Sequence, residues 1–229
     1  MPKGGTGAAF FTPDLMGFLR DLARHNNRPW FQENKTRYEG SVQEPAVRFI
    51  DAMGPRLSAL SPHLVADPRP FGGSLMRIYR DTRFSKDKSP YKTQVGIHFP
   101  YDGAGHGQHF PGFFLHIGPG ESELYAGMWH PEPPHLKKIR DAIVDSPAAW
   151  GKVVGKRIQI GGETYARVPA GYDLNHRYAD DLRHKDFFAG RSITDAQFVS
   201  AKLGDLFIAL CRELDPLNQF LAKAIGIPW

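Results

Sequence analysis

The amino-acid sequence predicts a single α+β domain in which an antiparallel β-meander in the middle of the chain is packed by N-terminal and C-terminal helices. Apolar residues recur at helical spacing before residue 60 and after residue 194. Between residues 75 and 129, four segments instead alternate apolar and polar residues as strands do. The loops between these segments contain glycine and proline and are too short for helical crossovers, which favours antiparallel pairing.

Three helices are predicted near the N-terminus. The first begins at Thr12-Pro13-Asp14, where a hydroxyl cap, a proline in the first turn and an acid near the positive end of the helix dipole coincide. Asn27 is expected to cap a second helix, with Pro29 in its first turn. A third helix is predicted from Pro45 to Leu60, and a proline-bearing loop follows it.

The strand-like segments are followed by a second helical region. The strands are predicted at 75–80, 93–99, 112–117 and 123–129. The later elements are helices at 131–145, after Pro147, at 175–184 and after a Thr194 cap, with extended segments at 157–168 and 186–193. The chain has no internal repeat and no linker long enough to divide it. Residues 10–229 are therefore expected to form one domain and residues 1–9 a disordered tail.

The composition predicts a soluble, cytoplasmic protein with no membrane partner. Hydrophobic residues make up 41% of the chain, but no apolar run approaches the ~20 residues that a membrane span requires. Residues 1–9 lack the apolar stretch and cleavage site of a signal peptide. The single cysteine, Cys211, can form no internal disulfide, which suits a reducing compartment. Its apolar helical surroundings favour a buried core thiol over a nucleophile.

Positive charge is concentrated in the segment from Arg77 to Lys92. This segment contains six cations and two acids, so it contributes +4 of the chain's net charge of +5. The rest of the chain is nearly neutral. A local anion site is therefore favoured over a broad nucleic-acid-binding surface.

Five stretches of the sequence resemble a known family. They are RIYRDTRFSKDKSPYK at 77–92, NNRPWF at 26–31, GFFLHI at 112–117, GMWHP at 127–131 and PAGYD at 169–173. The chain resembles the family catalogued as domain of unknown function 2461, uncharacterised proteins found mainly in bacteria, from about residue 11 to residue 221. The resemblance implies a single-domain α+β fold and implies no activity.

The residues of the basic segment favour an anion-binding site for a phosphate- or carboxylate-bearing small molecule. Guanidinium groups bind such oxygens in bidentate fashion, and aromatic rings nearby can stack on a planar ligand. The candidate ligand-binding residues are Arg77, Arg80, Arg83, Lys88, Tyr79, Arg28 and Trp129. If the site is catalytic, the acid/base candidates are Asp81, Tyr91 and His116. Whether the protein is an enzyme, and which cofactor it would use, does not follow from the sequence.

Two other interpretations of the basic segment are open. It could be an internal salt-bridge hub of a structural or partner-binding protein, paired with Glu33, Glu39 or Glu44. It could also contact the phosphates of a nucleic acid, although the near-neutral remainder of the chain argues against that partner. Six histidines between His98 and His135 suggest a metal site only weakly, because their spacing matches no metal motif.

Overall fold

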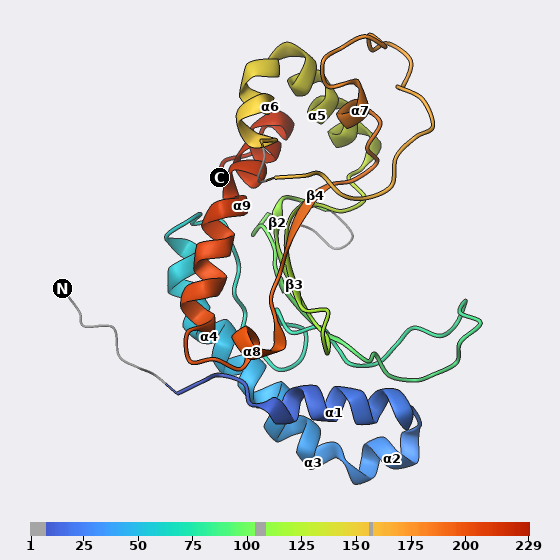
Figure 1. The fold of residues 1–229 in the computed structure, drawn as a ribbon, viewed down its shortest axis with the longest axis vertical. Helices are drawn as coiled ribbons and strands as arrows, with labels where there is room; N and C mark the ends of the chain where they lie inside the picture. Colours follow the sequence, from blue (N-terminus) through green and yellow to red (C-terminus); the bar gives the residue numbers. More distant parts are fainter. Residues whose placement is uncertain (1–7, 104–108, 156–157) are drawn as a thin grey trace, which may run out of the picture.

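Helices occupy both ends of the chain and strands its middle, so the predicted α+β class is confirmed (Figure 1). The structure is a computed structural model that describes residues 8–103, 109–155 and 158–229. Most of the predicted N-terminal tail therefore lies outside the described residues. In the described part of the chain, no helix is both long enough and apolar enough to cross a membrane.

The N-terminal helices form a compact helical hairpin, which contacts the basic segment through Asn26 and Phe31. Asn27 caps the second of them as predicted, because its side chain accepts a hydrogen bond of 3.0 Å from the backbone N–H of Trp30. Thr12 precedes the first helix, but its hydroxyl makes no capping hydrogen bond. The elements are α1 (Pro13–Arg24), α2 (Arg28–Glu33), α3 (Lys35–Tyr38), the π-helical turn η1 (Glu39–Gln43) and α4 (Glu44–Ser58).

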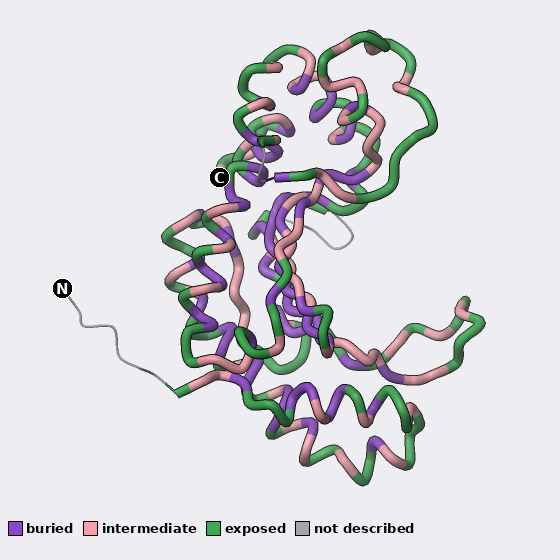
Figure 2. The backbone as a smooth tube through the Cα atoms, viewed as in Figure 1, coloured by how far each residue is buried: buried purple, intermediate pink, exposed green. Residues whose placement is uncertain are grey.

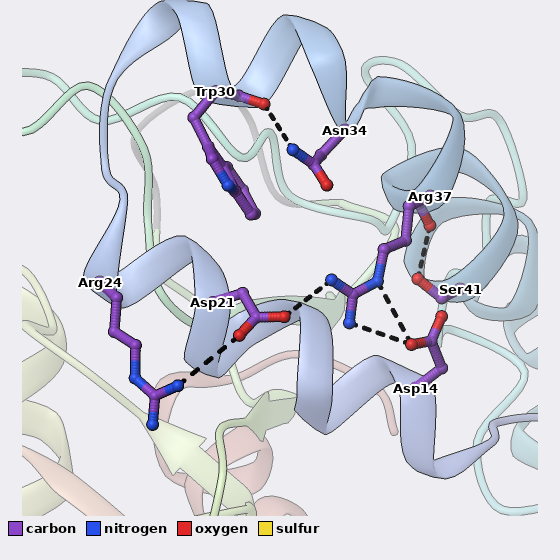
Figure 3. Close-up of polar contacts among 7 residues, drawn as sticks. All are labelled: Asp14, Asp21, Arg24, Trp30, Asn34, Arg37 and Ser41. Atoms are coloured by element: carbon purple, nitrogen blue, oxygen red, sulfur yellow. Dashed lines mark hydrogen bonds and ion pairs between the residues drawn. The ribbon is translucent and has the colours of Figure 1, made fainter.

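Arg37 fastens α3 to α1 (Figure 3). Its Nη1 lies 2.8 Å from Oδ2 of Asp21, and its Nη2 lies 3.0 Å from Oδ1 of Asp14. The hydrogen bond from Arg37 lowers the pKa of Asp21 below its usual value. Gly17 leaves room for the guanidinium, since a Cβ there would lie 3.2 Å from Nη2.

We expect Arg37→Ala to destabilise the protein by about 1 kcal/mol, because it removes two partly exposed ion pairs together. In a chain of this size, that loss corresponds to a fall in Tm of about 2–4 °C, which differential scanning calorimetry can measure. Arg37→Lys is the control. It keeps the charge but cannot bridge both carboxylates with one planar group, so it is expected to recover only part of the loss. An alanine variant with unchanged Tm would contradict the fastening role.

The sheet has four strands, and every neighbouring pair is antiparallel. The order in space, β1-β2-β3-β4, is the order in the sequence, which confirms the predicted meander. Leu115 on β2, for example, pairs with Ile97 on one side and Leu124 on the other. The strands are β1 (Val95–Phe99), β2 (Gly112–Ile117), β3 (Glu123–Met128) and β4 (Phe187–Ser192).

The two faces of the sheet have different surroundings. Val95, Ile97 and Phe99 are buried on the face where α9 (Leu203–Ile225) packs against β3. Within the described residues, Figure 1 shows no helix over the other face. We call it the open face. It carries His98, Phe114, Tyr125 and Phe188, all at least partly exposed.

A helical lobe, residues 129–186, is inserted between β3 and β4 (Figure 1). Its largest core side chain is Trp150, which is fully buried and donates a 2.6 Å hydrogen bond to Oδ2 of Asp181. Trp150 also packs against Phe187 of β4 and Phe220 of α9, which ties the lobe to the sheet and to the C-terminal helix. The lobe contains α5 (Pro133–Asp145), α6 (Pro147–Val153) and α7 (Ala179–Leu182), and α8 (Asp195–Phe198) follows β4.

Three sequence-based assignments were wrong in extent. The predicted strand 75–80 forms only isolated bridges. The described part of the predicted extended segment 157–168, which begins at residue 158, also forms only isolated bridges. The predicted helix 175–184 shrinks to α7. At its expected start, the side chain of Asp173 accepts the backbone N–H of Asn175, a local turn bond that competes with helix formation.

Candidate functional site

Residues 77–92, which we call the basic hairpin, fold back on themselves. The backbone N–H of Lys92 donates to the carbonyl of Ile78 at 2.7 Å, and that of Arg80 donates to the carbonyl of Pro90 at 2.9 Å. These two bonds bring the ends of the hairpin together and leave residues 81–89 as a projecting tip (Figure 1). The tip residues are largely exposed or intermediate in burial (Figure 2).

Two residues of the N-terminal helical hairpin hold the base of the basic hairpin. The Asn26 side chain accepts the backbone N–H of Tyr91 at 3.1 Å and donates Nδ2–H to the Tyr91 carbonyl at 3.0 Å. The ring of Phe31 stacks on the Tyr91 ring, with centroids 4.1 Å apart and planes 20° apart. Both rings are 2% exposed, so this contact is part of the core.

Two of the hairpin's three arginines are neutralised by acids of the hairpin itself. Arg80 forms an ion pair with Asp87, and Arg83 forms a bidentate pair with Asp81, with Nη2 to Oδ2 at 2.6 Å and Nε to Oδ1 at 3.0 Å. The hydrogen bond from Arg83 holds the pKa of Asp81 at about 2. Hydrogen bonds from Ser89 and Arg80 hold the pKa of Asp87 well below its usual range. Both acids therefore stay ionised near neutral pH.

Four of the hairpin's six cations form no ion pair with a described acid: Lys86 and Lys88 at its tip, and Arg77 and Lys92 at its base. Arg77 is exposed and Lys92 is partly buried, and neither forms an ion pair with an acid that the structure describes. Burial lowers the pKa of Lys92, and the positive charge of Arg77 lowers it further. The base of the hairpin thus holds positive charge that the protein leaves uncompensated.

A pocket with a volume of about 380 Å³ opens between the end of α1 and the hairpin. Two cations and one acid line it, and the acid is already paired with one of the cations. Its other walls are mainly neutral hydrogen-bonding groups, which can donate to an oxygen ligand. The lining residues are Arg80, Lys92 and Asp87, then Asn26, Ser89, Thr93 and Gln94, and finally Ala23 and Tyr91.

The structure brings together only part of the predicted site. Arg80 and Tyr91 line the pocket. Burial raises the pKa of Tyr91, and the nearby charge of Arg28 opposes that shift. Tyr79 is 51% exposed, with its ring centroid 5.4 Å from that of Tyr91. These residues surround the same end of the hairpin, and their roles in binding or catalysis remain predictions.

Other predicted site residues lie outside the pocket lining. Arg83 is paired at the tip, and Lys88 donates to the carbonyl of Thr82 at 2.9 Å. His116 lies on β2, with Nε2 3.8 Å from Oε1 of Glu121. The remaining three are Arg77, next to the pocket; Asp81, held by Arg83; and Trp129, which follows β3.

The internal-hub interpretation predicted buried acids from the first helices as partners. The acids that pair with the hairpin arginines, Asp81 and Asp87, instead belong to the hairpin and are exposed. Glu39 pairs with Lys35 of its own helical region. The ion pairs stabilise the local turn and do not connect the hairpin to the N-terminal helices.

Sequence reasoning missed two important residues of the pocket. Lys92 was counted in the charge of the segment but not chosen, although its position opposite Ile78 puts it beside Arg77 once the segment folds back. Asparagine is common at helix ends and in turns, so Asn26 carries no mark of this contact, and its partner Tyr91 is 65 residues away. A local pattern carries no signal for such a contact.

The histidine-rich region provides no ligand cluster in the part of the chain that can be described. There, no group of three or more His, Cys, Asp or Glu side chains is arranged to hold a metal ion. His106, one of the six histidines considered, lies outside the described residues.

Comparison with protein families agrees with the fold and with the sequence stretches that form the hairpin and its support. The model of a family described as "Conserved hypothetical protein (DUF2461)" matches residues 14–220. The chain belongs to the DUF2461 family. The DUF2461 match includes Asn26, Phe31 and the whole basic hairpin, and it carries no statement of activity. No curated protein and no solved structure matches the chain.

Proposed function

We propose that the pocket beside the basic hairpin binds a small molecule that carries a phosphate or carboxylate group. The observation that carries the proposal is Lys92, a pocket-lining cation with no acidic partner among the described residues. Its charge is disfavoured by burial and by Arg77, so an anion at this position would relieve an existing electrostatic cost.

The surroundings of Lys92 support an oxygen-rich ligand. Arg80 provides a second cation, and its partner Asp87 is also held by Ser89, whose N–H lies 2.9 Å from Oδ1. Asp87 therefore keeps hydrogen-bond donors if Arg80 turns to a ligand. Thr93 and Gln94 add neutral donors to the same wall. Tyr91 is the one predicted acid/base residue in the lining, and the proposal concerns binding and not a reaction.

Lys92→Gln tests this proposal with inorganic pyrophosphate as the probe in isothermal titration calorimetry. We expect the variant to bind at least about 10-fold more weakly, because about 1.4 kcal/mol of charge-assisted binding is lost. Lys86→Gln is the matched control, since Lys86 has the same charge in the same hairpin but does not line the pocket. Equal losses in both variants, or no pyrophosphate binding by the unmodified protein, would overturn the proposal.

The proposal also predicts a pH effect. An anion favours the protonated amine, so saturating pyrophosphate is expected to raise the pKa of Lys92 from its lowered value. By the same linkage, pyrophosphate affinity should fall as pH rises through that pKa, beginning below the usual lysine value of about 10.4. NMR titration of the lysine Cε resonances measures both effects, with Lys92→Gln giving the assignment. A Lys92 pKa that does not respond to pyrophosphate would place the anion elsewhere.

A further inference from the structure

A buried carboxylate orients a histidine at the junction between β3 and the helical lobe. Asp186 is 1% exposed, and its Oδ1 accepts the backbone N–H of His130 at 2.7 Å. The same oxygen lies 3.1 Å from Nδ1 of the His130 ring, while Oδ2 accepts the backbone N–H of Glu163 at 3.2 Å. Asp186 therefore holds the backbone of His130 by a hydrogen bond and places a carboxylate oxygen beside Nδ1 of its ring.

This arrangement determines which ring nitrogen is available to a ligand. An ionised carboxylate can only accept hydrogen bonds, so the proton of a neutral His130 ring belongs on Nδ1. Nε2 then presents a lone pair. The His130 side chain is 58% exposed, and no described residue forms a hydrogen bond with Nε2. The acceptor nitrogen thus belongs to a largely exposed ring.

The backbone around the pair is held in an unusual conformation. His130 has φ +50°, and it is the one non-glycine residue with positive φ in the described ranges. Gly162 approaches Asp186 so closely that a Cβ there would lie 2.6 Å from the Asp186 Cβ. Sparsely populated backbone conformations persist where the surrounding contacts enforce them, and they are concentrated at ligand sites.

An exposed aromatic ring lies next to the oriented imidazole. Trp129 is 61% exposed, and its ring stacks on that of His130 with centroids 4.6 Å apart and planes 26° apart. It directly follows β3, whose last residue is Met128. Phe188 pairs with Gly127 and packs edge-on to Tyr125. Trp129 is therefore an exposed ring just beyond the end of β3, stacked on His130.

We propose that Trp129, His130 and Asp186 form a second ligand site, which binds a neutral heteroaromatic ring bearing an N–H donor, of the nucleobase type. The exposed indole face of Trp129 suits a flat π-system. The lone pair on Nε2 suits an N–H donor at the ring edge. Asp186 is a positioning residue that acts through His130. A role for Asp186 in tying two loops together accounts for its bonds to backbone N–H groups, but not for the oriented ring and the exposed indole.

Saturation-transfer NMR with adenosine tests the site. Adenosine has no phosphate, so its binding is independent of the pocket at the basic hairpin, and Lys92→Gln should leave it unchanged. We expect saturation on the base protons in the unmodified protein and at least a 10-fold weaker effect in Trp129→Ala. Phe84→Ala is the control, because Phe84 is an exposed aromatic residue, 96% exposed, in the hairpin tip.

Two further variants keep the test decisive if truncation disturbs folding. His130→Asn tolerates positive φ but removes the imidazole, so it should fold and bind adenosine several-fold more weakly. Asp186→Asn removes the negative charge beside Nδ1, so ¹⁵N NMR should show a smaller share of the Nδ1–H tautomer of His130, with weaker adenosine binding. Saturation confined to the ribose protons, no saturation, or equal saturation in Trp129→Ala and Phe84→Ala would overturn the proposal.

Discussion

Trp150→Ala is expected to lower the free energy of unfolding by about 3–5 kcal/mol, the cost of truncating a fully buried tryptophan. Trp150 is 0% exposed, and its ring centroid lies 4.9 Å from that of Phe220 and 6.0 Å from that of Phe187. Its removal leaves a cavity where the helical lobe, β4 and α9 meet. Urea denaturation followed by circular dichroism measures the loss.

Trp150→Phe separates packing from hydrogen bonding. It keeps a ring in the cavity but removes the indole N–H that donates to Asp181 at 2.6 Å. We expect a smaller loss, about 1–3 kcal/mol, since a carboxylate loses a donor and some volume is lost. If the alanine variant lost no more stability than the phenylalanine variant, Trp150 would not be the packing centre of this junction.

Asn26→Ala is expected to cost about 2–4 kcal/mol, because it leaves both backbone groups of Tyr91 without partners in a partly buried site. The base of the basic hairpin would also lose its fixed position. Pyrophosphate affinity should therefore fall by more than the stability loss explains at temperatures where the variant is fully folded. Calorimetric titration and denaturation on the same samples measure the two effects.

Two neighbouring substitutions sharpen this prediction. Asn26→Asp keeps the acceptor for the Tyr91 N–H but sets a carboxylate oxygen against the Tyr91 carbonyl, so it should be nearly as harmful as alanine. Asn27→Ala removes the α2 cap, a loss of about 1 kcal/mol, without touching Tyr91. Equal effects of Asn26→Ala and Asn27→Ala on pyrophosphate binding would contradict the role of the Asn26–Tyr91 hydrogen bonds in positioning the pocket.

The elements that the sequence predicted well are those with a sustained period. Helices α1 and α4 and strands β1 to β3 each bury one face, so their residues repeat at the spacing of the element. The basic hairpin was harder, because only its base is hydrogen-bonded and its exposed tip is free of packing constraints. Because only two backbone hydrogen bonds hold this segment, its apolar residues need not repeat at a helical or strand spacing.

The candidate sites depend on contacts between distant parts of the chain. The charge of residues 77–92 is visible in the sequence, but which cations stay unpaired depends on the fold. Asp81 and Asp87 neutralise Arg83 and Arg80, and among the cations left without an acid Lys92 lines the pocket. His130 and Asp186 are 56 residues apart. No spacing rule connects them. The sequence predicted Trp129 as part of the anion site at the basic segment, whereas the structure leads us to propose it for the site at His130.

The insertion of residues 129–186 between β3 and β4 has a consequence for biosynthesis. When β3 leaves the ribosome, its edge has no partner until the whole lobe and β4 have been made. An unpaired strand edge can pair with another chain. Nascent chains that end before residue 187 are therefore expected to associate through β3, whereas chains that extend past residue 192 are not.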